Sequence, residues 1–194
     1  MKQLVFATAN PNKVKEVSML LPDGFVIKGL ADIGCFEELP ETHNTIAANS
    51  LEKAEYLHEK YGFDCFSEDT GLEVTALNGE PGVDTAFYSG SRDPQQNMEL
   101  LLLNLRNQSD RSAQFRTVFT LFIEKKWYQF EGIVTGMIAE KPIGDKGFGY
   151  DPIFIPEGAA LTFGEMEPEQ KKAFSHRAKA FNLMTAFLKA NFEI

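Results

Sequence analysis

The chain has 194 residues, of which 43% are hydrophobic and 24% charged. This length and composition are typical of a water-soluble globular protein, and we expect one domain over residues 1–194. The formal net charge of −9 argues against general binding to nucleic acid or to anionic membranes. It does not exclude a small anionic substrate, because a local basic pocket can lie in an acidic protein.

The sequence contains no recognisable targeting signal for a compartment other than the cytoplasm. The two cysteines, Cys35 and Cys65, are too few for a disulfide framework and predict reduced thiols. The apolar stretch at the start is too short for a signal peptide, and no apolar run approaches the length of a membrane span. We therefore expect a cytoplasmic protein.

Helices and strands alternate in the first part of the chain. A buried strand is predicted at residues 4–7, and Asn10 followed by Pro11 is a typical start of a helix. That helix has apolar residues at helical spacing, namely Val14, Val17, Leu20 and Leu21. A second strand is predicted at 25–27. A polar loop over 37–44 leads into another helix, whose apolar face carries Ile46, Ala47, Leu51, Ala54 and Leu57.

The next segments predict short strands and turns. A strand starting at Cys65 is expected to end in a glycine turn at residues 68–71, and residues 72–76 suggest a further strand. Asn78-Gly79 and Pro81-Gly82 are turn signals, and Asp93-Pro94 repeats the pattern of a cap followed by proline.

The second half changes character. Apolar residues at even spacing predict a long antiparallel hairpin of residues 112–124 with 127–139. A glycine-rich loop at 144–149, a short strand at 152–155 and a last helix capped by Ser175 follow. Helices and strands that alternate around a central hairpin indicate an α/β protein with a mixed sheet.

The first candidate site is the turn between the first strand and the first helix, with Thr8, Asn10 and Lys13. Free backbone N–H groups at a helix N-terminus suit a phosphate group, and Lys13 adds a full positive charge. Taken alone, the segment is better explained as a capped helix with a solvated lysine, because it lacks the glycines of a phosphate-binding loop.

The second candidate is the pair Glu68 and Asp69. Adjacent residues of a strand face opposite sides, so only one of these carboxylates points into a given cleft, and we choose Asp69. Carboxylate oxygens suit Mg²⁺, which binds one or two carboxylates together with substrate phosphate. A solvated turn explains the segment equally well.

Three more polar residues lie before and on the predicted second helix. Glu41 is in the polar loop, where a lone glutamate is usually solvated. Asn49 and Lys53 are four residues apart and share a helix face. An interior position for both is unexpected unless they contact a polar ligand.

Residues 147–152 read Gly-Phe-Gly-Tyr-Asp-Pro. Glycines on both sides of Phe148 allow close approach of the backbone and present the ring, which can stack on a base. Asp151 can accept a hydrogen bond from a purine ring N–H. A tight turn with core aromatics is the alternative.

The last candidate is Lys171 with Ser175-His176-Arg177. Cations in the first turn of a helix oppose its dipole, so His176 and Arg177 suggest an anionic or carbonyl partner. A surface arginine beside a neutral histidine is the alternative. The spacing of the three histidines does not fit a zinc site, and no nucleophile-elbow motif is present.

Taken together and in this order, these segments resemble the inosine/xanthosine triphosphate pyrophosphatase family, and they span nearly the whole chain. The matching elements are Thr8-x-Asn10-x-x-Lys13, Glu41, Asn49 with Lys53, Glu68-Asp69-Thr70-Gly71-Leu72, Pro81-Gly82, Gly147-Phe148-Gly149-Tyr150-Asp151-Pro152, and Lys171 with Ser175-His176-Arg177. Each is weak alone, but their combination in this order is specific.

The resemblance implies a long, twisted mixed sheet with flanking helices, two lobes around a nucleotide cleft, and a homodimer. It implies Mg²⁺-dependent hydrolysis of non-standard purine nucleoside triphosphates (ITP, dITP, XTP) to monophosphate and pyrophosphate. It assigns Mg²⁺ to Glu41 and Asp69, with Asp69 as the catalytic base. The implied substrate contacts are Thr8, Asn10, Lys13, Lys53, Thr70, Phe148, Gly149, Tyr150, Asp151, Lys171, His176 and Arg177.

Within this assignment Phe148 stacks on the purine, while Asp151, His176 and Arg177 read its edge. The residues themselves leave open whether Asp69 or Glu68 is the base. One departure from the family pattern is Phe87, where bacterial relatives often carry an arginine before Tyr-Ser-Gly. Two rival functions remain: a pyrophosphatase acting on pyrimidine or modified nucleotides, and a nucleotide-binding sensor without turnover.

Overall fold

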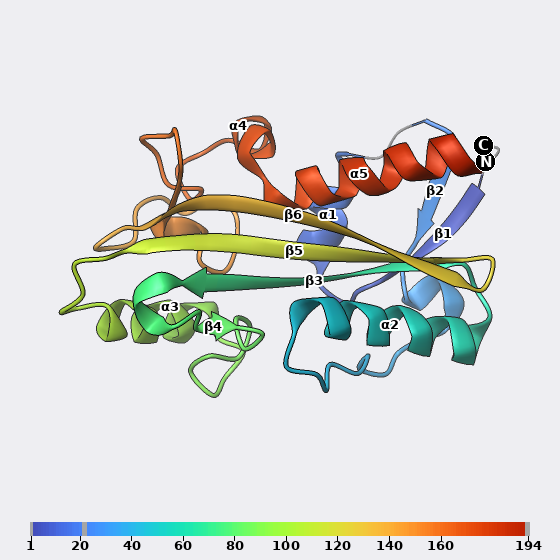
Figure 1. The fold of residues 1–194 in the computed structure, drawn as a ribbon, viewed down its shortest axis with the longest axis horizontal. Helices are drawn as coiled ribbons and strands as arrows, with labels where there is room; N and C mark the ends of the chain where they lie inside the picture. Colours follow the sequence, from blue (N-terminus) through green and yellow to red (C-terminus); the bar gives the residue numbers. More distant parts are fainter. Residues whose placement is uncertain (1, 21–22, 193–194) are drawn as a thin grey trace. The chain divides into compact units, whose positions relative to one another are not determined.

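The structure is a computed structural model that describes residues 2–20 and 23–192. Figure 1 shows an α/β protein with a mixed sheet and flanking helices, as predicted. The strands are β1 (Lys2–Ala7), β2 (Phe25–Lys28), β3 (Cys65–Val74), β4 (Pro81–Gly82), β5 (Ser112–Ile123), β6 (Lys126–Ile138) and β7 (Phe154–Pro156). The helices are α1 (Pro11–Ser18), α2 (Ile46–Tyr61), α3 (Pro94–Asn104), α4 (Pro168–Phe174) and α5 (His176–Asn191). Three 3₁₀ turns are η1 (Ala31–Ile33), η2 (Thr75–Leu77) and η3 (Asp151–Ile153).

The strand order is β2-β1-β3-β5-β6-β7, and β4 pairs with β3. β1 is parallel to both β2 and β3, with Leu4 opposite Ile27 and Phe6 opposite Phe66. β3–β4 and β6–β7 are antiparallel. Parallel and antiparallel pairs in one sheet confirm the predicted mixed topology.

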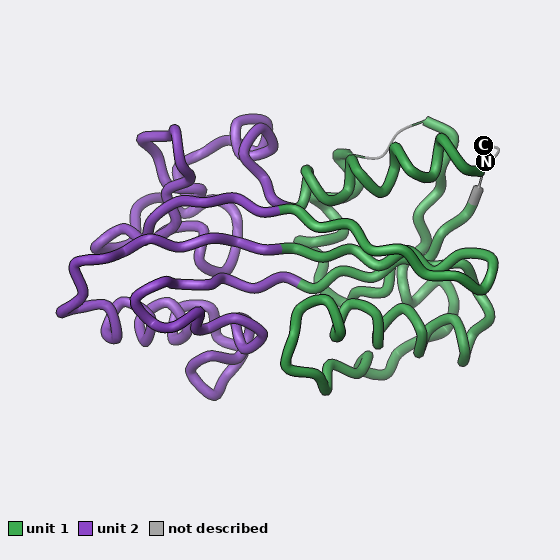
Figure 2. Tube along the Cα trace, in the orientation of Figure 1, with its two compact units in different colours: residues 1–69, 117–132, 177–194 green, residues 70–116, 133–176 purple. Residues whose placement is uncertain are grey.

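The chain divides into two compact units, which Figure 2 colours separately. Unit 1 comprises residues 1–69, 117–132 and 177–194, and unit 2 comprises residues 70–116 and 133–176. Strands β3, β5 and β6 each begin in one unit and end in the other.

The sheet part of unit 1 is buried on both faces. On one face Leu4 and Phe6 of β1 pack in a cluster with Val17 of α1 and Phe181 of α5. On the other face α2 covers the strands, as Figure 1 shows, and its Leu57 packs with residues of β1 and β3. Burial on both faces explains why residues 4–7 are apolar throughout, without alternation.

Unit 2 has a core on one face of its strands. The alternate residues Phe115 of β5 and Val134 and Ile138 of β6 point into it, together with Leu101 and Leu105 from α3 and the following turn. The intervening side chains of β6, Thr135 and Met137, are exposed. This alternation is what the hairpin prediction rested on.

The largest difference from the predicted elements lies at residues 68–71. Instead of ending a strand in a turn, these residues continue as β3 through Gly71 to Val74. The expected turn was wrong because Asp-Thr-Gly is a local signal, whereas the ladders to neighbouring strands hold this segment extended. Glu68 and Asp69 are therefore mid-strand residues.

The remaining elements agree with the predictions within a few residues. α1 and α3 begin at the proline after a capping Asn10 and Asp93, and α5 begins directly after Ser175. β7 begins at Phe154, two residues later than expected. Pro81–Gly82, read as a turn signal, forms the short strand β4, and α4 was not predicted. Leu21 lies outside the described residues. Among the described residues, no helix combines the length and the apolar character that crossing a membrane requires.

Candidate active site

The first turn of α1 is shaped by the side chains that precede it. Asn10 Oδ1 accepts hydrogen bonds from the backbone N–H groups of Asn12 (2.9 Å) and Lys13 (3.4 Å), and Thr8 Oγ1 accepts one from the N–H of Asn10 (3.2 Å). These bonds satisfy donors that a helix N-terminus otherwise leaves open. Thr8 and Asn10 thus form the turn, as the capping signal predicted, and aim Lys13 from the first turn of α1.

Lys13 belongs to a buried ionic cluster in unit 1. Its Nζ lies 3.5 Å from Oε1 of Glu68, whose side chain is fully buried. Arg177 at the start of α5 donates two hydrogen bonds of 2.9 Å to the two oxygens of Glu68, and its Nη1 also donates to Glu16 of α1. The cluster thereby joins α1, β3 and α5 within this unit.

Burial and pairing shift the pKa values in this cluster in opposite directions. Burial of Lys13 lowers the pKa of its ammonium group and outweighs the attraction of Glu68. Burial also disfavours the charged form of Arg177, but the carboxylates of Glu68 and Glu16 outweigh it and raise its pKa. The Arg177 side chain is only 2% exposed. It is thus an internal ion-pair partner in this structure.

A second cluster lies on the other face of β3. Nζ of Lys53, on α2, donates to Glu41 Oε1 and lies 3.4 Å from Asp69 Oδ1. Burial disfavours the charged form of Lys53, but Asp69 and Glu41 outweigh it and raise its pKa. The pKa of Asp69 is also raised, mainly by burial, despite the attraction of Lys53. Glu68 and Asp69 thus have different partners, as strand alternation predicted.

Side chains of α2 hold the loop that carries Glu41. Asn49 Oδ1 accepts a hydrogen bond from the backbone N–H of His43 (2.8 Å), and Glu52 accepts from both the N–H (2.8 Å) and the hydroxyl (2.7 Å) of Thr42. The interior position of Asn49, which the sequence left unexplained, allows its side chain to bond the backbone of the loop before α2. Its contact places the Glu41 carboxylate beside Lys53.

The donor set of unit 1 suits a divalent cation bound together with a phosphate. Among its described residues, four carboxylates form these ion pairs with three cations, so the acidic groups outnumber the basic groups by one. The carboxylates are Glu16, Glu41, Glu68 and Asp69, and the cations are Lys13, Lys53 and Arg177. The described residues contain no group of three or more His, Cys, Asp or Glu that could hold a metal ion. A pair of carboxylates such as Glu41 and Asp69 fits Mg²⁺, which completes its shell with water and substrate phosphate.

In unit 2, Asp151 shapes the loop that presents Phe148. Asp151 Oδ2 accepts hydrogen bonds from the backbone N–H of Phe148 and from Lys171 Nζ, both at 2.7 Å. Lys171 Nζ also lies 5.1 Å from the centre of the Phe148 ring. A Cβ on Gly147, which has a φ of +74°, would lie 2.0 Å from Asp151 Oδ2, so only glycine permits this closure.

The other predicted residues of unit 2 are Gly149 and Tyr150 of this loop, His176 at the start of α5 and Thr70 of β3. The hydroxyl of Tyr150 donates to the carbonyl of Thr85 (3.0 Å), and burial raises the pKa of Tyr150. The ring of His176 stacks on Phe115, with centroids 4.8 Å apart and planes at 10°. Gly149 has a φ of +62°, which favours glycine. Thr70 is partly buried on β3.

The predicted site residues are divided between the two units. Unit 1 holds Thr8, Asn10, Lys13, Glu41, Lys53, Asp69 and Arg177, and unit 2 holds Thr70, Phe148, Gly149, Tyr150, Asp151, Lys171 and His176. Sequence reasoning missed Glu16, the second partner of Arg177. Its only local signal is that it lies one helical turn from Lys13.

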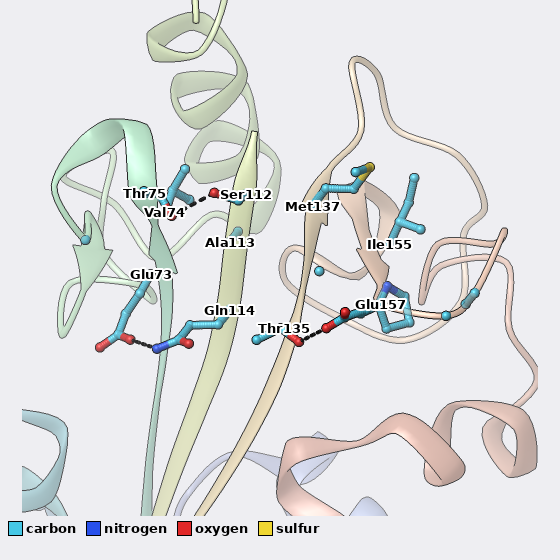
Figure 3. A pocket seen from close by; sticks show the side chains of 15 residues that line it. Glu73, Val74, Thr75, Ser112, Ala113, Gln114, Thr135, Met137, Ile155 and Glu157 are labelled. Atoms are coloured by element: carbon cyan, nitrogen blue, oxygen red, sulfur yellow. Dashed lines mark hydrogen bonds between the residues drawn. The ribbon is translucent and has the colours of Figure 1, made fainter. Parts of the chain in front are cut away.

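Unit 2 also contains a cavity of about 720 Å³, shown in Figure 3. Its polar lining includes Glu73, Gln114, Thr135 and Glu157, which come from β3, β5, β6 and the residue after β7. Gln114 donates to Glu73 (2.6 Å) and Thr135 donates to Glu157 (2.5 Å). None of the predicted site residues lines it, so the cavity is separate from the candidate site residues.

A family model, named relatives and solved structures all match this protein over nearly its full length. A model of the Ham1 family matches residues 4–187. A protein of Flavobacterium psychrophilum named dITP/XTP pyrophosphatase is 50% identical over 96% of this chain and 99% of its own length. A protein of Bacillus subtilis with the same name is 40% identical over 98% of both chains.

The fold agrees as well. The solved Ham1 protein of Staphylococcus aureus has a TM-score of 0.89 and 36% identity, over 98% of this chain and 100% of its own. A structure from Mycobacterium abscessus, described as a nucleoside-triphosphatase or dITP/XTP pyrophosphatase, has a TM-score of 0.78 and 38% identity over 96% and 99% of the two chains. With these similarities over nearly the full length, this chain belongs to the Ham1 family.

Proposed function

We propose that this protein hydrolyses the triphosphates of non-standard purine nucleosides (ITP, dITP and XTP) to the monophosphate and pyrophosphate, which removes them from the nucleotide pool. Relatives that match almost the whole chain carry the name dITP/XTP pyrophosphatase. The observation that carries the proposal in the structure is the convergence of Glu41 and Asp69 on Lys53, which brings acidic and basic groups for a metal–phosphate complex into contact.

The triphosphate binds at the N-terminus of α1 in this proposal. Thr8 and Asn10 shape the turn, and Lys13 and Lys53 supply positive charge. The lowered pKa of Lys13 reflects a cation that burial has partly deprived of solvent, so a polyanion gains more from it than from a solvated lysine. Lys171 is the further predicted nucleotide contact, from unit 2.

Mg²⁺ is the proposed cofactor, held by Glu41 and Asp69. When bound, a divalent cation neutralises charge on the phosphoryl oxygens and lowers the pKa of bound water. The carboxylates of the chain provide hard oxygen ligands, and Lys53 between them holds their orientation. Phosphoryl transfer of this kind depends on positioning and charge stabilisation more than on covalent catalysis.

Asp69 is the proposed general base that accepts a proton from the attacking water. Its raised pKa brings the carboxyl group closer to the range in which a base is effective at neutral pH. Glu68, the other candidate, has no exposed surface and accepts two hydrogen bonds from Arg177. A carboxylate held in this way is a poor proton acceptor, which favours Asp69.

The purine base is proposed to stack on Phe148, with Thr70, Gly149 and Tyr150 against the substrate and with Asp151, His176 and Arg177 reading the base edge. Hypoxanthine and xanthine carry a carbonyl at C6, which pairs with donors, whereas the amino group of adenine does not. A site built to hydrogen-bond one group can reject an analogue by about 10⁴–10⁵. Asp151 and Arg177 already form hydrogen bonds within the protein. Mutation of these two residues therefore tests whether they also bind the edge of the base.

Further properties complete the proposal. The chain acts as a single domain over residues 1–194, forms a homodimer, and works in the cytoplasm without nucleic-acid or membrane partners. Cys35 and Cys65 are free thiols, as is usual in a reducing compartment. Light scattering coupled to size exclusion tests the dimer, and a monomer at micromolar concentration contradicts it.

The decisive experiment measures pyrophosphate release from ITP, dITP, XTP, GTP, ATP and a pyrimidine triphosphate, with and without Mg²⁺. We expect Mg²⁺-dependent turnover of the first three substrates. Preferred turnover of the pyrimidine supports the rival pyrophosphatase, and binding without turnover supports the nucleotide sensor. Equal rates for ATP contradict readout of the base edge.

Asp69→Asn tests the base within the same assay. We expect kcat to fall by about 10²–10⁴, the usual contribution of general base catalysis. Asp23→Asn, at an exposed position of unit 1, is the matched control and should retain wild-type turnover. Near-native turnover of Asp69→Asn disproves the assignment.

A further inference from the structure

Three hydroxyl groups lie together in the interior of unit 1, between α2, β3 and β5. Ser50, Ser67 and Thr120 have no exposed surface. Ser50 Oγ lies 3.1 Å from Ser67 Oγ and 2.8 Å from Thr120 Oγ1. Buried hydroxyls cost free energy unless each is hydrogen-bonded, so their bonding pattern is informative.

The donors in this cluster can be assigned in only one way. Each hydroxyl has a single proton. The Ser67 hydroxyl donates to the backbone carbonyl of Ser50, so Ser50 must donate to Ser67. Thr120 must then donate to Ser50, and the side-chain amide of Gln129 donates to Thr120 at 3.1 Å. The result is a directed chain in which every hydroxyl both donates and accepts.

The three hydrogen-bonded hydroxyls lie directly beside the Lys53–Asp69 pair. Ser50 is one helical turn before Lys53 on α2, and Ser67 is two residues before Asp69 on the same face of β3. Two residues before Ser67, Cys65 Sγ donates to the carbonyl of Ala54 on α2 (3.4 Å). Three successive same-face residues of β3 therefore meet α2, and only the last of them belongs to the proposed catalytic group.

The direction of the Lys53 side chain explains how a contact at Ser50 controls a contact at Asp69. Helical side chains lean toward the N-terminus of their helix, so Lys53 extends past the level of Ser50 and reaches Asp69 at 3.4 Å. A shift or rotation of α2 over β3 changes that distance directly. The hydroxyl chain bonds α2 to β3 and to β5 at this level and so opposes such a shift.

We propose that Ser50, Ser67 and Thr120 are positioning residues for the Lys53–Asp69 pair, and that they act by holding α2 in register on β3. The inference rests on the proposed function for its consequence in turnover, but the register itself is a property of the folded chain. Catalytic groups displaced by about 1 Å can lose on the order of 10² in rate, so the cluster affects kcat without touching substrate.

The test uses Thr120→Val and Ser50→Ala in the full chain. Valine keeps the shape of threonine and removes the hydroxyl that links β5 to Ser50. We expect kcat to fall by about 10–100-fold, with KM for dITP within about threefold, because the hydrogen bonds of the three hydroxyls do not involve the turn before α1. Thr120→Ser restores the hydroxyl and should keep kcat near the wild-type value.

A second readout does not depend on turnover. Lys53 is 5% exposed and held between two carboxylates, whereas the Lys60 side chain on the same helix is 50% exposed. Amine labelling followed by peptide mass spectrometry gives the ratio of Lys53 to Lys60 modification. We expect this ratio to rise several-fold in Thr120→Val and Ser50→Ala, and to remain unchanged in Thr120→Ser.

Ile123→Val is the matched control, because Ile123 is buried on the opposite face of β5 and its truncation destabilises the unit without removing a hydroxyl. Its kcat and labelling ratio should stay at the wild-type values. The inference is overturned if Thr120→Val and Ser50→Ala leave both readouts unchanged, or if Ile123→Val changes both equally at a similar loss of thermal stability. If wild-type protein releases no pyrophosphate from any nucleotide, the proposed function fails, while the labelling ratio still decides the register.

Discussion

At the scale of single residues, burial changes what a charged side chain does. Arg177 at the start of a helix suggested a cation that meets a ligand, since a helix N-terminus repels positive charge. In the structure its guanidinium is buried and bonded to Glu68 and Glu16. Two carboxylates offset both the helix dipole and the cost of burial, so the arrangement is stable only as a group.

The buried pair makes a prediction about stability. Arg177→Met leaves Glu68 buried without its bidentate partner, and we expect a loss of about 3–5 kcal/mol in the free energy of unfolding. The double variant Arg177→Met/Glu68→Gln removes the uncompensated charge and should recover part of that loss. Urea unfolding of both variants measures the difference. A single variant that costs under about 1 kcal/mol contradicts the role of the pair.

At the scale of elements, the loop before α2 is tied to that helix at both ends. Asn49 and Glu52 hold its end near Glu41. At its start, Glu37 accepts hydrogen bonds from Lys60 (2.7 Å) and Tyr61 (2.7 Å), in the last turns of α2. A loop fixed in this way can place one carboxylate reproducibly although it has no regular structure.

Glu37 gives this attachment a pH dependence. The hydrogen bond from Lys60, followed by that from Tyr61, lowers the pKa of Glu37 from 4.5 to about 2. A carboxyl group with a depressed pKa stabilises the fold above its unfolded-state pKa, and this stabilisation is lost as the pH falls toward the folded-state value. We therefore expect Glu37→Gln to lower Tm at pH 7, and the difference from wild type to shrink between about pH 4.5 and pH 2.

Thermal melts at pH 7, 5, 4 and 3 check this expectation. Glu59→Gln, at an exposed position of α2, controls for the loss of one negative charge. A Tm difference for Glu37→Gln that stays constant from pH 7 to pH 3 shows that the attachment does not depend on ionised Glu37.

At the scale of the whole molecule, the two units are not separable in sequence. Each unit is assembled from segments that are distant in the chain, and β3, β5 and β6 pass from one unit into the other. Unfolding of either unit therefore breaks strands that the other unit needs for its own sheet. This continuity supports the proposal of one domain over residues 1–194.

A single cooperative transition follows from this continuity. Differential scanning calorimetry should give one peak, with the calorimetric enthalpy equal to the van't Hoff enthalpy calculated for the oligomeric state found in solution. A pyrophosphate or nucleotide ligand that binds the native state should move the whole peak to higher temperature. Two resolved transitions, of which only one responds to the ligand, contradict a single domain.

The sequence by itself determined the local features. The cap and proline at Asn10-Pro11 and Asp93-Pro94 predicted two helix starts correctly, because capping depends on residues that are neighbours in the chain. Alternating apolar residues predicted the β5–β6 hairpin within a residue at each end, although its turn at Glu124 and Lys125, both with positive φ, lacks the usual glycine. The ordered set of polar motifs was sufficient for the family and its activity.

The tertiary structure alone decided which side chains meet. Glu16 and Arg177 pair across 161 positions, and Ser50 meets Thr120 across 70. Asp69 lies in the middle of β3, where the sequence suggested a turn. Such partners depend on strand order and helix register, which bring distant segments together and exclude water from their contacts. Local patterns specify the face to which a side chain points, but not the residues that it contacts on that face.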